Sequence, residues 1–293
     1  MVSVAFKYLA VDSYEAASAA LADNGEDARL LAGGQSLLPM LNLRLARPSV
    51  LIDINALDGS PPTLRPDGVL SFPAMTRHQT VVDSPLVRSR CPMLSCAVSQ
   101  VGNVRVRSRG TIGGSLAHAD PTAEISCVAL ALGAEVIALG PNGQRTVPVR
   151  ELFVTYLTTV LRADEVVTEV RMPALAKHEG WSFHEMVRRA SDFATVGVAA
   201  TVTVTEDSRT VRDAQVALIG VDQRPVMAES RPLAALIGLD PTDADLAAVA
   251  DGIADGTTPG TDVHASAWYR KRLVAVLSAR ALAEALERAR ENR

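Results

Sequence analysis

Two short glycine-rich segments hold the residues of this chain best suited to binding a ligand. The first spans Ala32 to Leu37 and the second spans Gly110 to Ser115, and each contains a Gly-Gly pair beside small polar residues. Glycine has no Cβ, so its backbone can approach a ligand closely and can adopt positive φ. Successive N–H groups in such bends bind anions. One pair alone predicts only a tight turn, but two together indicate a site for the two phosphates of a dinucleotide.

Other nucleotide-binding and catalytic signatures are absent from the sequence. It lacks G-x-G-x-x-G after a strand and the Walker A pattern, which argues against a Rossmann site and an ATPase. It also lacks H-E-x-x-H and G-x-S-x-G. The 3 cysteines are too few for a disulfide framework or a cluster held by four thiolates. Ligand-binding bends without acid–base machinery are typical of a protein that holds a cofactor.

Three polar residues follow the second bend. His118 either contacts a cofactor or bonds to the backbone of its loop. Asp120 and Glu124 share one face of a predicted helix, close to the bend. A carboxylate there could accept hydrogen bonds from sugar or ribityl hydroxyls. The alternative is an acid favoured by the helix dipole, which suits Asp120 better than Glu124.

Two further groups of residues could face a ligand. Arg105, Arg107 and Arg109 alternate before the second bend, and at strand spacing all three would point the same way, toward phosphate or solvent. Asp192 and Phe193 follow an Arg-Arg pair in the C-terminal part. We expect Phe193 either to pack against a flat ring or to fill the core.

Composition excludes several classes of protein. The chain has 293 residues, 48% of them apolar and 21% charged, and a net charge of −4, which gives no support for nucleic-acid binding. No run of apolar residues is long enough to span a membrane, and the N-terminus does not resemble a signal peptide. A cytoplasmic location is the expectation.

Periodicity predicts an α+β protein of three parts, with bounds at 1–57, 58–176 and 177–293. The first part contains a helix over 12–24 and strands over 29–32 and 50–54. The second contains strands over 69–74 and 165–172, helices over 92–101 and 120–132, and a hairpin over 134–149. The third contains strands over 181–189, 195–205 and 211–221, then helices over 228–237, 242–254 and 266–291.

Three motifs occur in an order that resembles a known family. Segments 32–39, 110–121 and 188–194 are similar to the FAD-binding medium subunit of the molybdenum hydroxylases, which include carbon monoxide dehydrogenase, xanthine-dehydrogenase-like enzymes, and nicotine- and caffeine-type dehydrogenases. The resemblance implies a p-cresol methylhydroxylase-type FAD-binding fold of two α/β subdomains. A C-terminal domain with a three-stranded antiparallel sheet and three helices would follow them.

The resemblance also implies a set of FAD-binding residues, without a catalytic side chain or a metal. Backbone N–H groups of both bends would hold the pyrophosphate: Ala32, Gly33, Gly34, Gln35, Ser36, Leu37, Thr111, Ile112, Gly113, Gly114 and Ser115. Glu124 would lie near the hydroxyl-bearing chain, Val167 beside the adenine or flavin, and Phe193 near the isoalloxazine. His118, Asp120 and Asp192 complete the set. Gln35 and Ser115 depart from members with His and Asn there, and segment 183–186 lacks a lysine common in relatives.

The resemblance implies an electron-transfer subunit of a heterotrimer, with two heterotrimers arranged as a dimer. A large partner would oxidise substrate at a molybdenum–pterin centre, and two [2Fe–2S] clusters on a small partner would carry electrons to FAD on this chain. NAD⁺, oxygen, a quinone or another carrier would accept them. Two alternatives stay open: a stand-alone FAD-dependent oxidase or dehydrogenase with its own substrate pocket, and a non-catalytic assembly subunit that has lost flavin.

Overall fold

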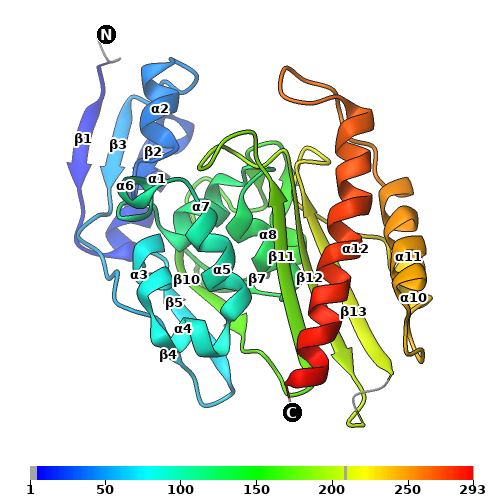
Figure 1. The fold of residues 1–293 in the computed structure, drawn as a ribbon. Coiled ribbons are helices and arrows are strands. Elements are labelled where there is room, and N and C mark those ends of the chain that lie inside the picture. The colour runs from blue at the N-terminus through cyan, green and yellow to red at the C-terminus, as the bar shows by residue number, and fades with distance from the viewer. Residues whose placement is uncertain (1–4, 208–209, 293) are drawn as a thin grey trace.

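The N-terminal part is a small parallel sheet covered by one helix (Figure 1). The computed structural model describes residues 5–207 and 210–292. Strand β3 (Val50–Asp53) lies between β1 (Lys7–Ala10) and β2 (Ala28–Leu31), and both pairings are parallel. Helix α1 (Tyr14–Asn24) begins after Ser13, whose hydroxyl accepts the Ala16 N–H. The expectation missed β1 because the strand is short and mostly exposed.

The middle part is an antiparallel sheet of five strands with helices packed against it. The strand order is β4-β5-β10-β6-β7. The strands are β4 (Thr63–Leu64), β5 (Val69–Pro73), β6 (Glu135–Gly140), β7 (Gly143–Pro148) and β10 (Val166–Pro173). The predicted β6–β7 hairpin is confirmed by its register, in which Gly140 lies opposite Gly143.

Short helices connect the strands of the first two parts. They are α2 (Leu37–Asn42), α3 (His78–Asp83), α4 (Pro85–Arg90), α5 (Pro92–Gln100), α6 (Val104–Arg107), α7 (Ile112–His118), α8 (Glu124–Ala131) and α9 (Val149–Leu152), with the 3₁₀ turn η1 (Gly25–Asp27). A two-stranded hairpin of β8 (Phe153–Thr155) and β9 (Thr158–Thr159) follows α9.

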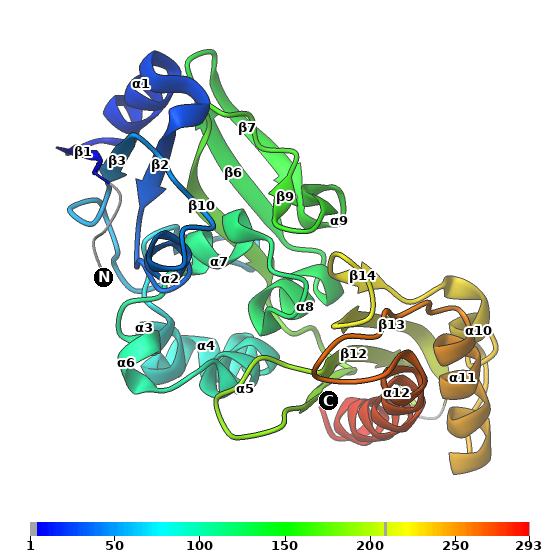
Figure 2. The same cartoon turned by 90° about the horizontal axis from the view of Figure 1, so that it is seen from above.

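The C-terminal part is an antiparallel sheet covered on one face by long helices (Figure 2). Its strands run in the order β11 (Glu179–Met186), β12 (Val196–Val204), β13 (Val211–Ile219) and β14 (Val226–Met227). Its helices are α10 (Ser230–Ala234), α11 (Asp243–Asp255) and α12 (Ala267–Glu291). The three predicted strands and helices are confirmed, and the fourth strand was missed because it has only two residues.

The C-terminal sheet is buried on both faces. On one face the side chains of Val198, Ala200 and Val202 pack with those of α12. On the other, Ala199 and Ala217 join the core of the middle part, which includes most of α8. Apolar packing of this kind is the main source of stability in a folded domain. The core of the middle part therefore extends without interruption into the C-terminal sheet.

Helix α12 approaches β11 so closely that only glycine fits at the contact. A Cβ on Gly180 would lie 1.9 Å from the carbonyl oxygen of Ala285 and 2.3 Å from the nitrogen of Ala289. Both are backbone atoms, so they cannot move aside without displacing the helix. At the other end of α12, buried Arg270 donates to the carbonyls of Thr195 and Gly220 and pairs with Asp262 at 2.8 Å.

We expect Gly180→Ala to lower the free energy of unfolding by about 1–3 kcal/mol, because overpacking forces the backbone of α12 away from β11. Gly260→Ala is the matched control, since a Cβ at Gly260 meets no atom within 4 Å. Thermal and urea melts of both variants measure the difference. Equal stability of the two variants would contradict the close packing of α12.

Candidate cofactor-binding site

The two glycine bends lie against each other. A Cβ on Gly33 would lie 2.1 Å from the carbonyl oxygen of Arg109 and 3.0 Å from the Cα of Gly110. The side chain of Ala32 lies 3.8 Å from the position of a Cβ on Gly114. Gly33 is therefore required sterically, because any side chain there would push the second bend away.

The first bend has backbone donors without partners. Among the described residues, the N–H groups of Gly33, Gly34, Gln35 and Ser36 donate no hydrogen bond. Gly34 has φ of 73°, a conformation that glycine adopts without strain. Gly33 is buried and Gly34 is half-buried, and N–H groups at such positions normally find an acceptor. A row of unused donors in a bend that contains a glycine at positive φ is the geometry of an anion-binding concavity.

The second bend uses its N–H groups internally, which differs from the expectation. Ile112 donates to the carbonyl of Thr76 at 3.1 Å, and Gly113 donates to that of Ala74 at 2.9 Å. Thr111 caps α7 by accepting the Gly114 N–H on its hydroxyl at 3.1 Å and the Ser115 N–H on its carbonyl at 3.0 Å. These bonds anchor the second bend to the loop after β5, so this bend serves as a rigid support for the first.

A buried histidine that the sequence analysis did not single out lies beneath the second bend. The Nε2 of His78 lies 3.0 Å from the hydroxyl of Ser115, and a Cβ on Gly110 would lie 2.7 Å from the imidazole ring. Burial lowers the pKa of His78 to about 4, so the ring is neutral at neutral pH. No motif marks His78, because its role follows from contacts with residues more than thirty positions away.

The three alternating arginines separate in the structure, so the prediction of one shared direction is wrong. They lie in and after α6 rather than in a strand, because Asn103 caps a helix by accepting the N–H groups of Arg105 and Val106. Arg107 turns inward and donates to carbonyls at the end of α5, including that of Ser99 at 3.1 Å. Arg109 lies beside the first bend, with its Nη2 3.5 Å from Asn55 Oδ1.

The acidic residues after the second bend occupy different positions from those predicted. Asp120 accepts the Thr122 N–H at 2.8 Å within a turn, and α8 begins later, at Glu124. Glu124 is only 8% exposed, and burial followed by repulsion from Glu185 and Asp120 raises its pKa to about 8. His118 ends α7, and burial lowers its pKa. Glu124 is thus a protonated acid at neutral pH, able to donate as well as accept.

Three predicted residues lie outside the bends and make no polar contact with them. Val167 is buried in β10 opposite Ala138. Asp192 and Phe193 lie in the loop between β11 and β12, where Asp192 pairs with Arg189 at 3.2 Å and Phe193 is 77% exposed. Within the described residues no hydrogen bond or ion pair joins these three to either bend. Their relation to a cofactor is therefore not fixed by direct contacts.

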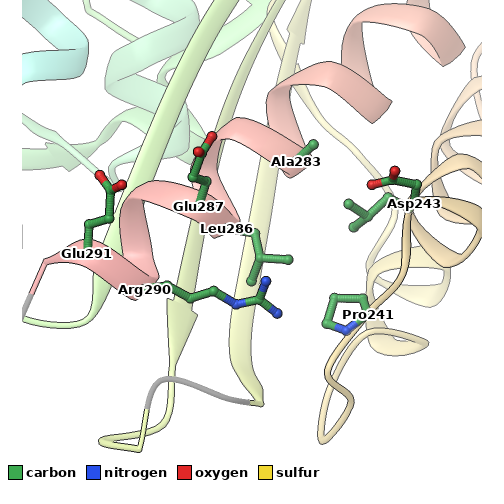
Figure 3. Close-up of a pocket in the computed structure, with 8 residues that line it drawn as sticks. Pro241, Asp243, Ala283, Leu286, Glu287, Arg290 and Glu291 are labelled. Carbon is green, nitrogen blue, oxygen red and sulfur yellow. The ribbon is translucent and has the colours of Figure 1, made fainter.

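The groove drawn in Figure 3 is not part of this site. It lies in the C-terminal part between the start of α11 and the end of α12, with a volume of about 410 Å³. It is lined by Pro241, Asp243, Leu246, Ala283, Leu286, Glu287, Arg290 and Glu291. Within residues 5–207 and 210–292 there is also no group of three or more His, Cys, Asp or Glu side chains able to hold a metal ion. The bends are thus the feature of the described chain best suited to a cofactor.

Comparison with known proteins identifies the class. Residues 4–175 match the family described as "FAD binding domain in molybdopterin dehydrogenase", and residues 181–285 match "CO dehydrogenase flavoprotein C-terminal domain". The chain therefore belongs to the family of FAD-binding subunits of molybdenum-dependent dehydrogenases, and it is an oxidoreductase subunit. No helix of the described residues is both long and apolar enough to cross a bilayer.

Individual relatives cover almost the whole chain. The 6-hydroxypseudooxynicotine dehydrogenase complex subunit alpha of Paenarthrobacter nicotinovorans is 39% identical over 97% of this chain and 96% of its own length. The carbon monoxide dehydrogenase medium chain of Hydrogenophaga pseudoflava is 35% identical over 96% of this chain and 97% of its own.

Solved structures show the same fold. A carbon monoxide dehydrogenase chain from Hydrogenophaga pseudoflava superposes with a TM-score of 0.94 at 36% identity, covering 98% of this chain and 99% of the other. A chain of quinoline 2-oxidoreductase from Pseudomonas putida 86 superposes with a TM-score of 0.92 at 34% identity, covering 99% and 100%. The chain is thus an FAD subunit of a multi-subunit molybdenum hydroxylase.

We expect Glu124→Gln to stabilise the FAD-free chain increasingly as pH rises. The pKa of Glu124 is raised from 4.5 to about 8 in the folded chain, so unfolding releases a proton between these values and wild-type stability falls with rising pH. Glutamine does not titrate, and its advantage should reach at least about 1 kcal/mol at pH 8. Urea melts at several pH values measure it, with exposed Glu151→Gln as the control. An advantage that does not change with pH would count against a protonated Glu124.

Proposed function

We propose that this chain binds FAD through its two glycine bends and passes electrons from a partner's [2Fe–2S] clusters to an acceptor such as NAD⁺, oxygen or a quinone. The observation that carries the proposal is the close approach of Gly33 to the carbonyl oxygen of Arg109. This contact places the unused N–H donors of the first bend beside the rigid second bend. FAD supplies the redox chemistry when bound.

The residues present fit a bound diphosphate. The N–H groups of Gly33, Gly34, Gln35 and Ser36 lack acceptors among the described residues, and phosphate oxygens would satisfy them. Thr111 holds the second bend in place through its cap. Protonated Glu124 would hydrogen-bond a hydroxyl of the ribityl chain, and Val167 and Phe193 would supply apolar contacts to the rings. These side chains bind and orient the cofactor, and none needs to act as an acid or base.

The partners follow from the relatives. We infer a large subunit with a molybdenum–pterin centre and a small [2Fe–2S] subunit, assembled as a dimer of heterotrimers in the cytoplasm. The relatives' names support this, since they include a medium chain, a complex subunit alpha and a Cu,Mo-CO dehydrogenase. Within the chain we propose two FAD-binding subdomains, 1–57 and 58–176, and a C-terminal domain, 177–293.

Flavin content tests the cofactor assignment. We expect the purified chain to retain FAD, and Gly33→Ala and Gly114→Ala to reduce the bound FAD roughly tenfold or more. A Cβ on Gly33 would push the two bends apart, and a Cβ on Gly114 would lie 2.6 Å from the Thr111 hydroxyl that caps α7. Gly260→Ala, in open space, should keep wild-type flavin content. Normal FAD content in both bend variants would contradict the site. Melting curves establish that the variants are folded.

Co-purification tests the partner assignment and the alternative of a stand-alone oxidase. We expect the native complex to contain two further polypeptides together with molybdenum and iron, and the isolated chain to show no substrate turnover. Turnover by the chain alone, or flavin that stays attached after denaturation, would favour the stand-alone enzyme. Native complex without flavin absorbance would favour an assembly subunit.

A further inference from the structure

Three side chains outside the glycine motifs form a polar cluster between the two bends. Asn55 follows β3, Arg77 is the N-cap of α3, and Arg109 precedes the second bend. The side chains of Arg77 and Arg109 converge on one atom, the Oδ1 of Asn55, at 3.0 Å and 3.5 Å. None of these residues belongs to the set that the sequence motifs predicted to contact FAD.

Asn55 holds the start of the first bend. Its Nδ2 donates to the carbonyl oxygens of Leu31 at 3.1 Å and Ala32 at 2.8 Å, where β2 ends and the bend begins. It also donates to Asp53 Oδ1 at 2.6 Å, which orients the amide. The direction in which the bend leaves the sheet is therefore set by a side chain that lies just after the neighbouring strand β3.

Arg77 holds the second bend at the point where the first bend rests on it. Its Nη1 donates to the carbonyl oxygen of Arg109 at 2.6 Å. This is the same oxygen that would lie 2.1 Å from a Cβ on Gly33. The guanidinium thus fixes the atom that Gly33 contacts, while its Nη2 bonds to Asn55. A planar fork is suited to joining two acceptors in this way.

The cluster also concentrates positive charge beside the free donors of the first bend. Burial and repulsion from Arg109 lower the pKa of Arg77, whereas Asp53 raises it. Asp53 is itself engaged by the hydroxyl of Tyr8 and by Asn55. The guanidinium groups of Arg77 and Arg109 lie near a single carboxylate, that of Asp53. The cluster therefore has a net positive charge, which suits an anionic ligand.

We propose that Asn55 and Arg77 are positioning residues that form a latch between the two glycine bends and set their spacing for the diphosphate of FAD. The proposal rests on the proposed function, since it names residues that prepare the same site. The latch acts on the cofactor through the backbone it holds. It does not need contact with FAD itself.

Three variants and a control test the latch in the full chain after removal of FAD. Arg77→Met removes the charge and the fork, and Arg77→Lys keeps the charge but not the fork. Asn55→Asp keeps the acceptor for Arg77 but cannot donate to the carbonyls of Leu31 and Ala32. Arg90→Met, an exposed arginine at the end of α4, is the control for loss of one positive charge. The probe is FAD, titrated by its fluorescence.

We expect all three latch variants to raise the dissociation constant of FAD roughly 10-fold to 100-fold, as loss of charge-assisted hydrogen bonds does, and Arg90→Met to leave it unchanged. The latch also predicts that the melting-temperature difference between the FAD-loaded and FAD-free chain shrinks in these variants. A merely structural role would lower both melting temperatures equally. If Arg77→Met does not fold, Arg77→Lys and Asn55→Asp carry the test.

The outcomes separate the latch from the proposed function. Wild-type affinity for FAD in Arg77→Lys would show that charge alone matters and would overturn the latch. Wild-type affinity in Asn55→Asp would overturn the role of Asn55. A wild-type chain that binds no FAD would overturn the proposed function itself, whatever the variants do.

Discussion

The contact between Gly33 and the carbonyl oxygen of Arg109 is the constraint on which the candidate site depends. The two segments come from different parts of the chain, and they approach each other to a distance that leaves no room for a Cβ. Backbone atoms cannot yield as side chains do, so the approach holds only when glycine occupies position 33. Because of it, the unused N–H groups of the first bend lie beside a support whose residues Ile112, Gly113, Gly114 and Ser115 all donate hydrogen bonds.

The second bend is rigid because other parts of the chain hold it in place. The second bend donates its N–H groups to the loop after β5 and rests on the ring of His78, which burial keeps neutral. A charged ring there would repel Arg77 and Arg107. Neutral His78 below and two arginines beside the bends thus place positive charge at the rim of the site and keep it out of the core. A preorganised site of this kind loses little free energy to ordering when a ligand binds.

The C-terminal part is held to the rest of the chain by apolar packing. Helix α8, which begins with Glu124, lies between the middle part and the face of the C-terminal sheet that contains Ala199 and Ala217. The opposite face packs against α12, where Gly180 permits close contact. Burial of Glu124 in this layer is the main reason that its pKa is raised. The raised pKa of Glu124 and the attachment of the C-terminal part therefore both follow from the packing of α8.

Local patterns in the sequence predicted most of the longer strands and helices, the hairpin at 134–149 and the two bends, because alternation and glycine placement act over a few residues. Short elements such as β1, β14 and α7 were missed. The tertiary structure alone decided which N–H groups stay free, that Arg107 caps α5 while Arg109 lies beside Asn55, and that His78 supports the second bend. These outcomes depend on contacts between residues far apart in the chain. Hydrogen-bond partners and burial are set by such contacts, which cannot be predicted from the residue types at neighbouring positions.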